Sequence, residues 1–262
     1  MTVARIGIDY TAAARQRAGI GRYTRELVTA LLTLESASQS PHEYVVFAAT
    51  GQLPRAHWQR EIDHLRACCN LQLAVRNLPL SDDWLARLWH RLRLPIPVET
   101  ITGSLDVFYS PDFVLPPTRR TTRTLLTVHD LSFLHCPEAF VPALRRYLER
   151  VVPRSIARAD LVLADSAHTR SDIVSLLGVP PDRVQVLYSG VPPGFRPGPE
   201  LGEGERLRAR YGLGDGCYVL SVGTLQPRKN YVRLIRAFAS LGPGTVEPET
   251  QLVIAGGRGW LY

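Results

Sequence analysis

Short apolar runs that alternate with helical patterns constrain the fold of this chain more than any other feature. The runs are apolar or β-branched, are bounded by turn residues or helical patterns, and lie at 5–9, 44–49, 106–109, 124–128, 161–164 and 184–187. Such strands, when helices separate them, are typical of a parallel sheet that is buried on both faces. The sequence therefore predicts an α/β fold with a doubly wound sheet.

The segments between these runs give weaker predictions. We expect a long polar loop from Tyr10 to Gly21, followed by a helix with Tyr23, Leu27, Leu31 and Leu34 at about helical spacing. The other expected elements are a helix at 58–69, a strand at 71–75, a helix at 142–159 that Pro153 kinks, and a helix from His168 to Leu177 that Gly178 ends.

The composition changes near residue 189. Glycine and proline crowd together in 190–194 and 197–199, and a new strand-helix-strand unit begins at Tyr218 and reaches its second strand at 251–254. We therefore predict an N-terminal α/β domain (1–190), a linker (191–216) with a short helix at 205–211, and the start of a second domain (217–262). One such unit cannot cover its own strands, since domains usually have about 100–150 residues. We expect a truncated two-domain protein.

The chain is basic and reads as a folded cytoplasmic protein. Its 262 residues carry a formal charge of +7, which favours an anionic partner: a nucleotide, a phospholipid head group or a nucleic acid. The four cysteines form no C-x-x-C pair, which favours reduced thiols and no metal. We find no signal peptide and no apolar run near the ~18 residues of a membrane span.

The stretch from Val219 to Asn230 is the clearest candidate for a binding site. A strand runs into Gly223, a short turn holds Arg228 and Lys229, and an amphipathic helix follows with Leu234, Ile235, Phe238 and Leu241 at helical spacing. A junction of this kind lies at the carboxyl edge of a parallel sheet, where α/β folds bind ligands. Free amides at the helix start and two cations suit a phosphate or a diphosphate.

The one lysine of the chain lies in this turn. Of 31 lysine and arginine residues, only Lys229 is a lysine. A compact ammonium and a planar guanidinium are not interchangeable at a phosphate. The alternative is a solvated basic turn.

Gly19 and Gly21 lie between a strand and a helix, where glycines let backbone amides approach a phosphate. The dinucleotide-binding fingerprint is incomplete, because Thr24 occupies the position of its third glycine. The alternative is a plain turn.

Polar residues also follow two strands at the expected carboxyl edge. His129 can donate a hydrogen bond to a ligand and Asp130 can orient it, or the two form a helix cap or loop. Ser166 suits a helix N-cap, and Arg170 either points toward an anion or pairs with an aspartate, Asp165 or Asp172.

The stretch from Trp84 to Leu94 is a basic amphipathic segment. Trp84, Leu88 and Leu92 fall on one helical face beside Leu85 and Trp89, and Arg87, His90 and Arg91 lie opposite. Such a helix either docks at a lipid interface or buries its apolar face against its own sheet.

The hydrolase, P-loop and zinc-protease motifs are absent from the sequence. A nicotinamide-dependent oxidoreductase would need the complete glycine fingerprint. The motifs that are present resemble, in this order, the retaining glycosyltransferases of the GT-B fold, family 4. The resemblance rests on Ala18–Leu27, Val128–Leu131, Ala164–Ser166 and Gly223–Asn230.

This resemblance implies two Rossmann-like domains, the second incomplete here, and a nucleotide-sugar donor, GDP- or UDP-linked, held mainly by the second. It implies metal-independent transfer without a cofactor, of mannose as a first hypothesis, to a saccharide or lipid-linked acceptor. It implies no nucleic-acid partner and allows a peripheral contact with the inner face of the plasma membrane. The implied site residues are His129 and Asp130 near the transferred sugar, Gly19, Gly21, Gly223, Thr224, Arg228, Lys229 and Asn230 at the donor phosphates, and Arg22, Ser166 and Arg170 as further candidates.

Two departures from the family pattern qualify this expectation. Thr224 stands where many relatives carry an arginine directly after the glycine, so Arg228 is expected to carry more of the charge. A pair of glutamates separated by seven positions, which holds the donor sugar and ribose, would lie beyond residue 262. The alternative is therefore a catalytically inactive module that binds acceptor, nucleotide or membrane.

Overall fold

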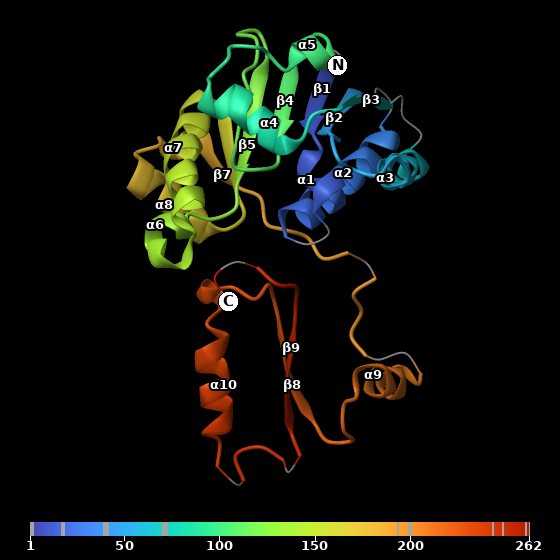
Figure 1. Cartoon of the computed structure of the whole chain (residues 1–262). Coiled ribbons are helices and arrows are strands. Elements are labelled where there is room, and N and C mark those ends of the chain that lie inside the picture. The colour runs from blue at the N-terminus through green and yellow to red at the C-terminus, as the bar shows by residue number, and fades with distance from the viewer. Residues whose placement is uncertain are drawn as a thin grey trace. The chain divides into compact units, whose positions relative to one another are not determined.

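A computed structural model describes residues 3–16, 19–38, 42–69, 73–192, 194–198, 201–242, 244–247, 249–259 and 261. The chain divides into two compact units (Figure 1). The first unit comprises Met1–Leu131 and Leu148–Pro192, and the second comprises Ser132–Tyr147 and Pro193–Tyr262. Each unit is described by itself.

The first unit is built on a seven-stranded sheet in which every neighbouring pair of strands is parallel. Its strands are β1 (Arg5–Asp9), β2 (Glu43–Ala49), β3 (Leu73–Leu78), β4 (Val107–Ser110), β5 (Arg123–Val128), β6 (Leu161–Ala164) and β7 (Val184–Val186). They lie in the order β3-β2-β1-β4-β5-β6-β7. The chain thus builds outward from β1 in both directions, which makes the β1/β4 junction a topological switch point. The expected α/β class is confirmed.

Helices fill the connections of the first unit. They are α1 (Thr11–Arg15), α2 (Ile20–Ser36), α3 (Arg55–Cys68), α4 (Asp82–Leu85), the π-helix η1 (Ala86–Arg91), α5 (Glu99–Thr102), α8 (Ala167–Leu177) and the 3-10 turn η3 (Pro181–Arg183). Helix α7 (Pro142–Arg158), with Pro153 inside it, contributes residues to both units. As expected, α8 ends at Gly178, whose left-handed conformation (φ 65°) is the usual helix C-cap.

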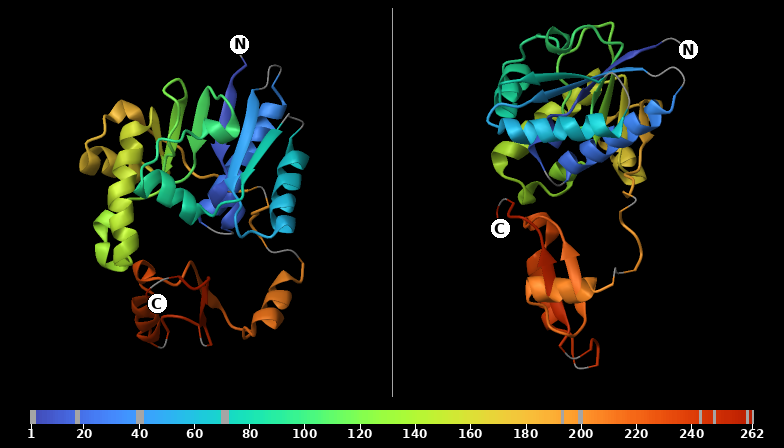
Figure 2. Two further views of the ribbon diagram at one scale, coloured as in Figure 1. Left: turned by 45° about the horizontal axis from the view of Figure 1, so that its top comes forward. Right: turned by 90° about the vertical axis from the view of Figure 1, so that its right-hand side faces the viewer.

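One face of the sheet packs against α1, α2 and α3. Strand side chains alternate between faces, so Tyr44, Val46 and Ala48 of β2 share a buried core with residues of these helices. The helical members of this core are Ala13, Ala14, Val28, Leu32, Ile62 and Leu65. Figures 1 and 2 show α2 and α3 side by side along the sheet.

The loop expected between Tyr10 and Gly21 is wrong in part, because Thr11–Arg15 form α1. Ala12, Ala13 and Ala14 are all buried, and alanine is the best helix former. Five residues are too few to show helical periodicity, which is why the sequence does not reveal this helix. The expected apolar face of the next helix is confirmed in part, since Leu27 and Leu31 are partly buried and pack against the core beside the buried Val28 and Leu32, while Leu34 is 76% exposed.

The expected apolar face of the 84–94 segment is confirmed in part. Leu85 and Trp89 are buried, and the Trp89 ring lies 6.2 Å from that of Phe47, whereas Trp84 and Leu92 are 53% and 66% exposed. The cause is the π-helix η1, which has more residues per turn than an α-helix and so rotates the buried face. His90 is half-buried instead of solvated, and burial, with a contribution from the charge of Arg158, lowers its pKa to about 4.

The second unit contains the predicted strand-helix-strand unit. Strand β8 (Tyr218–Val222) pairs in parallel with β9 (Gln251–Ala255), with the turn η4 (Pro227–Lys229) and α10 (Tyr231–Ala239) between them. Helix α9 (Glu203–Tyr211) precedes them, and α6 (Ser132–His135) and the 3-10 turn η2 (Pro137–Ala139) also belong to this unit. The expected single apolar face of α10 is confirmed only in part, because Leu234 and Phe238 are half-buried while Ile235 is 50% exposed.

All four cysteines are free thiols. Among the described helices, none combines the length and the apolar character needed to cross a membrane.

Candidate active site

The loop after β8 is held rigidly by its neighbour after β9. Backbone hydrogen bonds run from Gly223 N to Ala255 O (2.9 Å), from Leu225 N to Gly257 O (2.9 Å) and from Gly259 N to Leu225 O (3.0 Å). A Cβ on Gly256 would lie 1.9 Å from the Gly223 carbonyl oxygen, so only glycine fits there. The strand pairing thus continues past both strands and fixes the start of the candidate diphosphate loop.

The turn that follows presents the predicted cations to solvent. Residues Pro227–Lys229 form one 3-10 turn, and Asn230 adopts a left-handed conformation (φ 51°) from which α10 starts. Arg228, Lys229 and Asn230 are all exposed. Within the described residues, the Lys229 ammonium has no hydrogen bond or ion pair.

Two further side chains surround this turn. The Tyr231 hydroxyl donates to the Gly223 carbonyl oxygen (2.9 Å), which fastens the loop to the first residue of α10. Gln226 is 7% exposed, and its Oε1 has no hydrogen-bond partner among the described residues. A rigid turn with a free ammonium at a helix start can bind an anion through fixed charge and backbone amides.

The first unit brings ionisable residues together at the carboxyl ends of its strands. Asp9 ends β1, Asp112 follows β4, His129 follows β5 and Asp165 follows β6. These strands are β1, β4, β5 and β6, which are consecutive in the sheet and include the switch point. Parallel strands align these ends at one edge, which is where open α/β sheets bind ligands.

His129 is bound through both of its ring nitrogens. Nδ1 lies 2.7 Å from Asp165 Oδ2, and Nε2 lies 3.0 Å from the Pro111 carbonyl oxygen. Burial opposes the charged form of the ring, but the hydrogen bond and charge of Asp165 outweigh it and raise the pKa of His129. The side chain is only 10% exposed. The sequence prediction placed His129 at this edge but did not identify Asp165 or Pro111 as its partners.

Asp9 and Asp112 are two carboxyl groups that the sequence analysis missed. Burial raises the pKa of Asp9 to about 6, although hydrogen bonds from Thr11 oppose the shift. Burial likewise raises the pKa of Asp112, against the backbone N–H of Phe113 (2.6 Å) and the charge of His129. The available signal was their position, at or just after the end of an apolar strand.

Three hydroxyl groups lie beside this cluster. The Tyr109 hydroxyl is 2.8 Å from Thr127 Oγ1, and the Tyr23 hydroxyl is 3.4 Å and 3.5 Å from the same two oxygens. The Tyr23 ring meets the His129 ring edge-on, with centroids 4.8 Å apart. Burial raises the pKa of both tyrosines, so both hydroxyls stay protonated at neutral pH.

The predicted glycine pair has a packing role. Gly21 is buried, and a Cβ there would lie 2.2 Å from the Gln16 carbonyl oxygen and 2.6 Å from that of Ala12. Gly19 has a positive φ (59°) and open space around it. The close approach of α1 to α2 therefore requires Gly21, whether or not a ligand also uses the loop. The neighbouring Arg22 is 3.9 Å from Glu26 in an exposed ion pair.

The two candidates on α8 have structural roles. Ser166 is the N-cap, because its hydroxyl accepts from Thr169 N at 3.0 Å, as predicted. The Arg170 guanidinium donates to the carbonyl oxygens of Val184 (2.8 Å) and Pro181 (2.9 Å). These partners are backbone carbonyl groups, not the predicted anion or aspartate. We therefore leave Arg170 out of the candidate site. Asp130 is half-buried.

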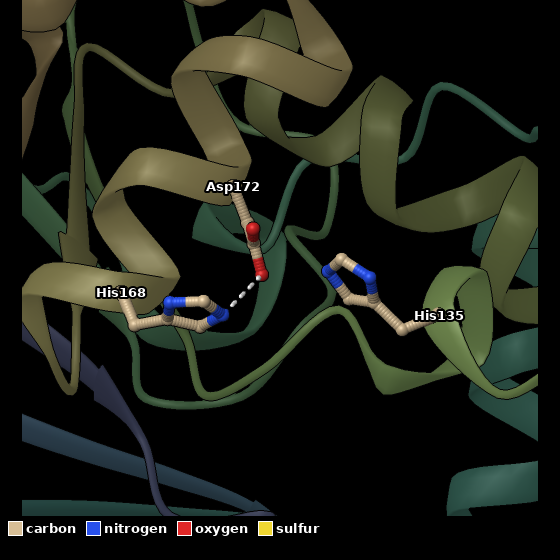
Figure 3. Close-up of side chains that lie close together, drawn as sticks. All are labelled: His135, His168 and Asp172. Atoms are coloured by element: carbon tan, nitrogen blue, oxygen red, sulfur yellow. Dashed lines mark ion pairs between the residues drawn. The ribbon is translucent and has the colours of Figure 1, made fainter.

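Helix α8 also carries a histidine-aspartate pair. His168 Nε2 and Asp172 Oδ2 are 3.7 Å apart, one helical turn from each other, and His168 is 84% exposed (Figure 3). His135, the third side chain drawn there, belongs to the second unit, and we assign no metal site to the three.

Comparison with known families now places the chain. A family model described as Glycosyltransferase Family 4 matches residues 17–195, which is well over half of the sequence. The chain belongs to this family. The matched span includes the Gly19–Gly21 loop and the strand ends that carry His129 and Asp165.

Relatives of known activity agree with this family 4 assignment. The chain is 32% identical over 246 residues to the O-antigen chain mannosyltransferase B of Escherichia coli, covering 92% of this chain and 61% of that protein. It is 39% identical over 104 residues to a GDP-mannose-dependent phosphatidylinositol monomannoside mannosyltransferase of Mycolicibacterium smegmatis, covering 39% of this chain and 26% of that protein. The chain thus spans about three fifths of the length of the Escherichia coli protein.

A solved structure supports the fold. HepE from Anabaena, in complex with UDP and glucose, matches with a TM-score of 0.58 and 16% identity, over 99% of this chain and 62% of HepE. At this identity the likeness concerns the fold alone. It confirms the expected GT-B-type, Rossmann-like fold class.

Proposed function

We propose that this chain carries the diphosphate-binding turn and the first-domain strand ends of a retaining glycosyltransferase. The reaction moves a hexose from a nucleotide sugar to a saccharide or lipid-linked acceptor. Mannose from GDP-mannose is the first candidate donor, because two relatives are named as mannosyltransferases and one of them as GDP-mannose-dependent. A UDP-linked donor is the second, because HepE is described with UDP and glucose.

The observation that carries this proposal is the turn at Lys229. An exposed ammonium that has no partner among the described residues, placed between β8 and α10, is suited to neutralise a diphosphate. As the nucleotide leaves, negative charge grows on its phosphates, and a positioned cation stabilises that charge. Arg228 supplies the second cation, and Gly223, Thr224 and Asn230 supply backbone close to it.

The proposed chemistry needs no metal and no cofactor, since side-chain cations take the place of a divalent ion. Gly19 and Gly21, with Arg22 beside them, keep their proposed place near the donor phosphates. His129 and Asp130 keep their proposed place near the transferred sugar.

The test uses charge removal with a matched control. Lys229→Met keeps the aliphatic stem and removes the charge. Arg236→Gln is the control, because it removes a cation near the C-terminal end of α10, away from Pro227–Lys229. A charge-assisted hydrogen bond contributes about 1.5–3 kcal/mol, so Lys229→Met should weaken GDP binding about 10- to 150-fold in calorimetry. Arg236→Gln should leave binding within about twofold.

The same variants, assayed for both GDP binding and sugar transfer, distinguish the transferase from the inactive nucleotide-binding module. A catalytically inactive module that only binds nucleotide would show the loss of GDP affinity but no mannosyl transfer from GDP-mannose. Equal GDP affinity in Lys229→Met and the unmodified chain would remove the diphosphate assignment. Transfer that chelation by EDTA abolishes would contradict metal independence.

We also propose a peripheral membrane contact at the exposed side of the 84–94 segment. Trp84 and Leu92 are exposed, and the Arg87 guanidinium lies 5.1 Å above the Trp84 ring. Partial loss of hydration lowers the pKa of Arg154, and the charges of Arg93 and Arg150 lower it further. These three arginines therefore lie near one another. Arginines beside an exposed tryptophan suit an anionic lipid surface.

A further inference from the structure

The side chain of His129 faces two groups that can only accept hydrogen bonds. The Asp165 carboxylate lies 2.7 Å from Nδ1, and the Pro111 carbonyl oxygen lies 3.0 Å from Nε2. A neutral imidazole has one N–H and one bare nitrogen, so it can satisfy only one of these contacts. In the other contact two lone pairs would face each other at hydrogen-bond distance. The geometry therefore requires a proton on both nitrogens.

The remaining neighbours of the ring are compatible with this charge. Tyr23 and Phe113 meet the ring edge-on, with centroids 4.8 Å and 5.4 Å away. The charged or titratable groups around it come from three elements: Asp165 after β6, Asp112 after β4 and the Tyr23 hydroxyl on α2. Thr169 of α8 donates to the His129 backbone oxygen at 3.2 Å. The neighbours with a charge are carboxyl groups, which favour a cation.

Asp165 is oriented by more than this one bond. It directly precedes Ser166, the N-cap of α8, so the helix start fixes its backbone. Its second oxygen, Oδ1, is buried without a hydrogen-bond partner among the described residues. A carboxylate that gives up part of its hydration must be offset by a nearby cation, and His129 is the cation in contact with it.

We propose that Asp165 is a positioning residue, which keeps the His129 ring doubly protonated and fixed between the ends of β4 and β6. This inference deepens the proposed transfer reaction and rests on it for its catalytic meaning. A ring with both nitrogens occupied by donated hydrogen bonds cannot take a proton from an acceptor hydroxyl. His129 therefore acts as a fixed positive charge at the sheet edge and not as a general base.

The ring of His129 can be observed directly, without any substrate. The chain has seven histidines, which nitrogen-edited NMR of a ¹⁵N-histidine-labelled sample can resolve, with single His→Gln variants for assignment. At pH 7 the His129 ring should show two protonated nitrogens. A ring with one bare nitrogen at pH 7, in the folded protein, would overturn the proposal.

The variant Asp165→Asn tests the role of the carboxylate. The amide is nearly the same size and removes the charge, so the titration midpoint of His129 should fall. Asp172→Asn is the matched control, because Asp172 lies on the same helix and pairs with another histidine, the exposed His168. The control should leave the His129 midpoint unchanged. An unchanged midpoint in Asp165→Asn would show that Asp165 does not hold the proton.

Kinetics then separate this inference from the proposed function. Asp165→Asn should lower kcat for sugar transfer by at least about tenfold while the KM for the donor stays within about twofold, and the loss should follow the His129 titration. A structural role alone would instead lower thermal stability and leave the pH profile of kcat unchanged. If no transfer is found in any variant, the NMR result still stands or falls independently.

Discussion

The replacement Asp9→Asn should make the first unit more stable at neutral pH. Burial raises the pKa of Asp9 from 3.8 to about 6, so its ionised form is disfavoured in the folded state. At 1.36 kcal/mol per pKa unit this corresponds to roughly 3 kcal/mol. Because the folded-state pKa lies above the unfolded one, the folded protein binds the proton more tightly. The protonated Asp9 side chain therefore makes its whole contribution to the free energy of unfolding below pH 3.8, and this contribution is lost as the pH rises through 6.

Asparagine keeps the local geometry while removing the charge. Asp9 Oδ1 accepts from Thr11 N at 2.9 Å at the start of α1, and an amide oxygen can accept the same bond. Between pH 4 and pH 8 the original chain should lose about 2–3 kcal/mol relative to Asp9→Asn. The two proteins should be nearly equal at pH 4.

Urea unfolding followed by tryptophan fluorescence gives the measurement. Trp58, Trp84 and Trp89 all belong to the first unit, so the signal reports mainly on its unfolding. Asp63→Asn, at an exposed site on α3, is the control and should change stability by less than about 0.5 kcal/mol at either pH. A stability difference between Asp9→Asn and the original chain that is the same at pH 4 and pH 8 would refute the reasoning.

Three further predictions concern packing, capping and the membrane. Gly21→Ala should lower the unfolding free energy by about 1–3 kcal/mol, since its Cβ would collide with the backbone oxygens of Ala12 and Gln16; unchanged urea stability would contradict this. Ser166→Ala should cost about 1 kcal/mol by removing the bond to Thr169 N, and Ser166→Asp should cost less. Binding to vesicles with anionic lipid should be weak and salt-sensitive and should fall in the double variant Trp84→Ser, Leu92→Ser; no binding at low ionic strength would remove the membrane contact.

The sequence predicts the strands better than the connections. β1 and β6 have the expected bounds, because each is a compact apolar run between turn residues. The α1 helix was missed because its three buried alanines carry no periodic signal. The prediction for the 84–94 segment holds for Leu85 and Trp89 but fails for Trp84 and Leu92, because the π-helix departs from the 3.6-residue period on which it rests.

In the candidate site, the sequence likewise predicts features that depend on adjacent residues better than contacts between distant segments. Lys229 and Ser166 could be identified locally, since a turn before a helix and a serine before a helix are patterns of adjacent residues. Asp165 and Pro111 could not be assigned to His129, because their contacts depend on the order of β4, β5 and β6 in the sheet. That order is set by packing among segments that are far apart in the sequence, so no single segment contains a sequence pattern that predicts it.

The role of Arg170 illustrates a related limit. A cation one turn into a helix after a strand suggested an anion or an aspartate partner. Its actual partners are carbonyl oxygens of Pro181 and Val184, at the start of the next 3-10 turn and strand. Backbone acceptors are present in every segment, so the sequence offers no signal that would single these out.

The most direct test of the central claim uses Lys229 as the one side-chain amine of the protein. Trace acetylation followed by mass spectrometry measures its reactivity, with the N-terminal amine as internal reference. At a GDP concentration that saturates the calorimetric signal, acetylation of Lys229 should slow at least about fivefold, because the diphosphate occupies its ammonium. GMP, which lacks the second phosphate, should slow it far less. A Lys229 reactivity that saturating GDP leaves unchanged would contradict the account.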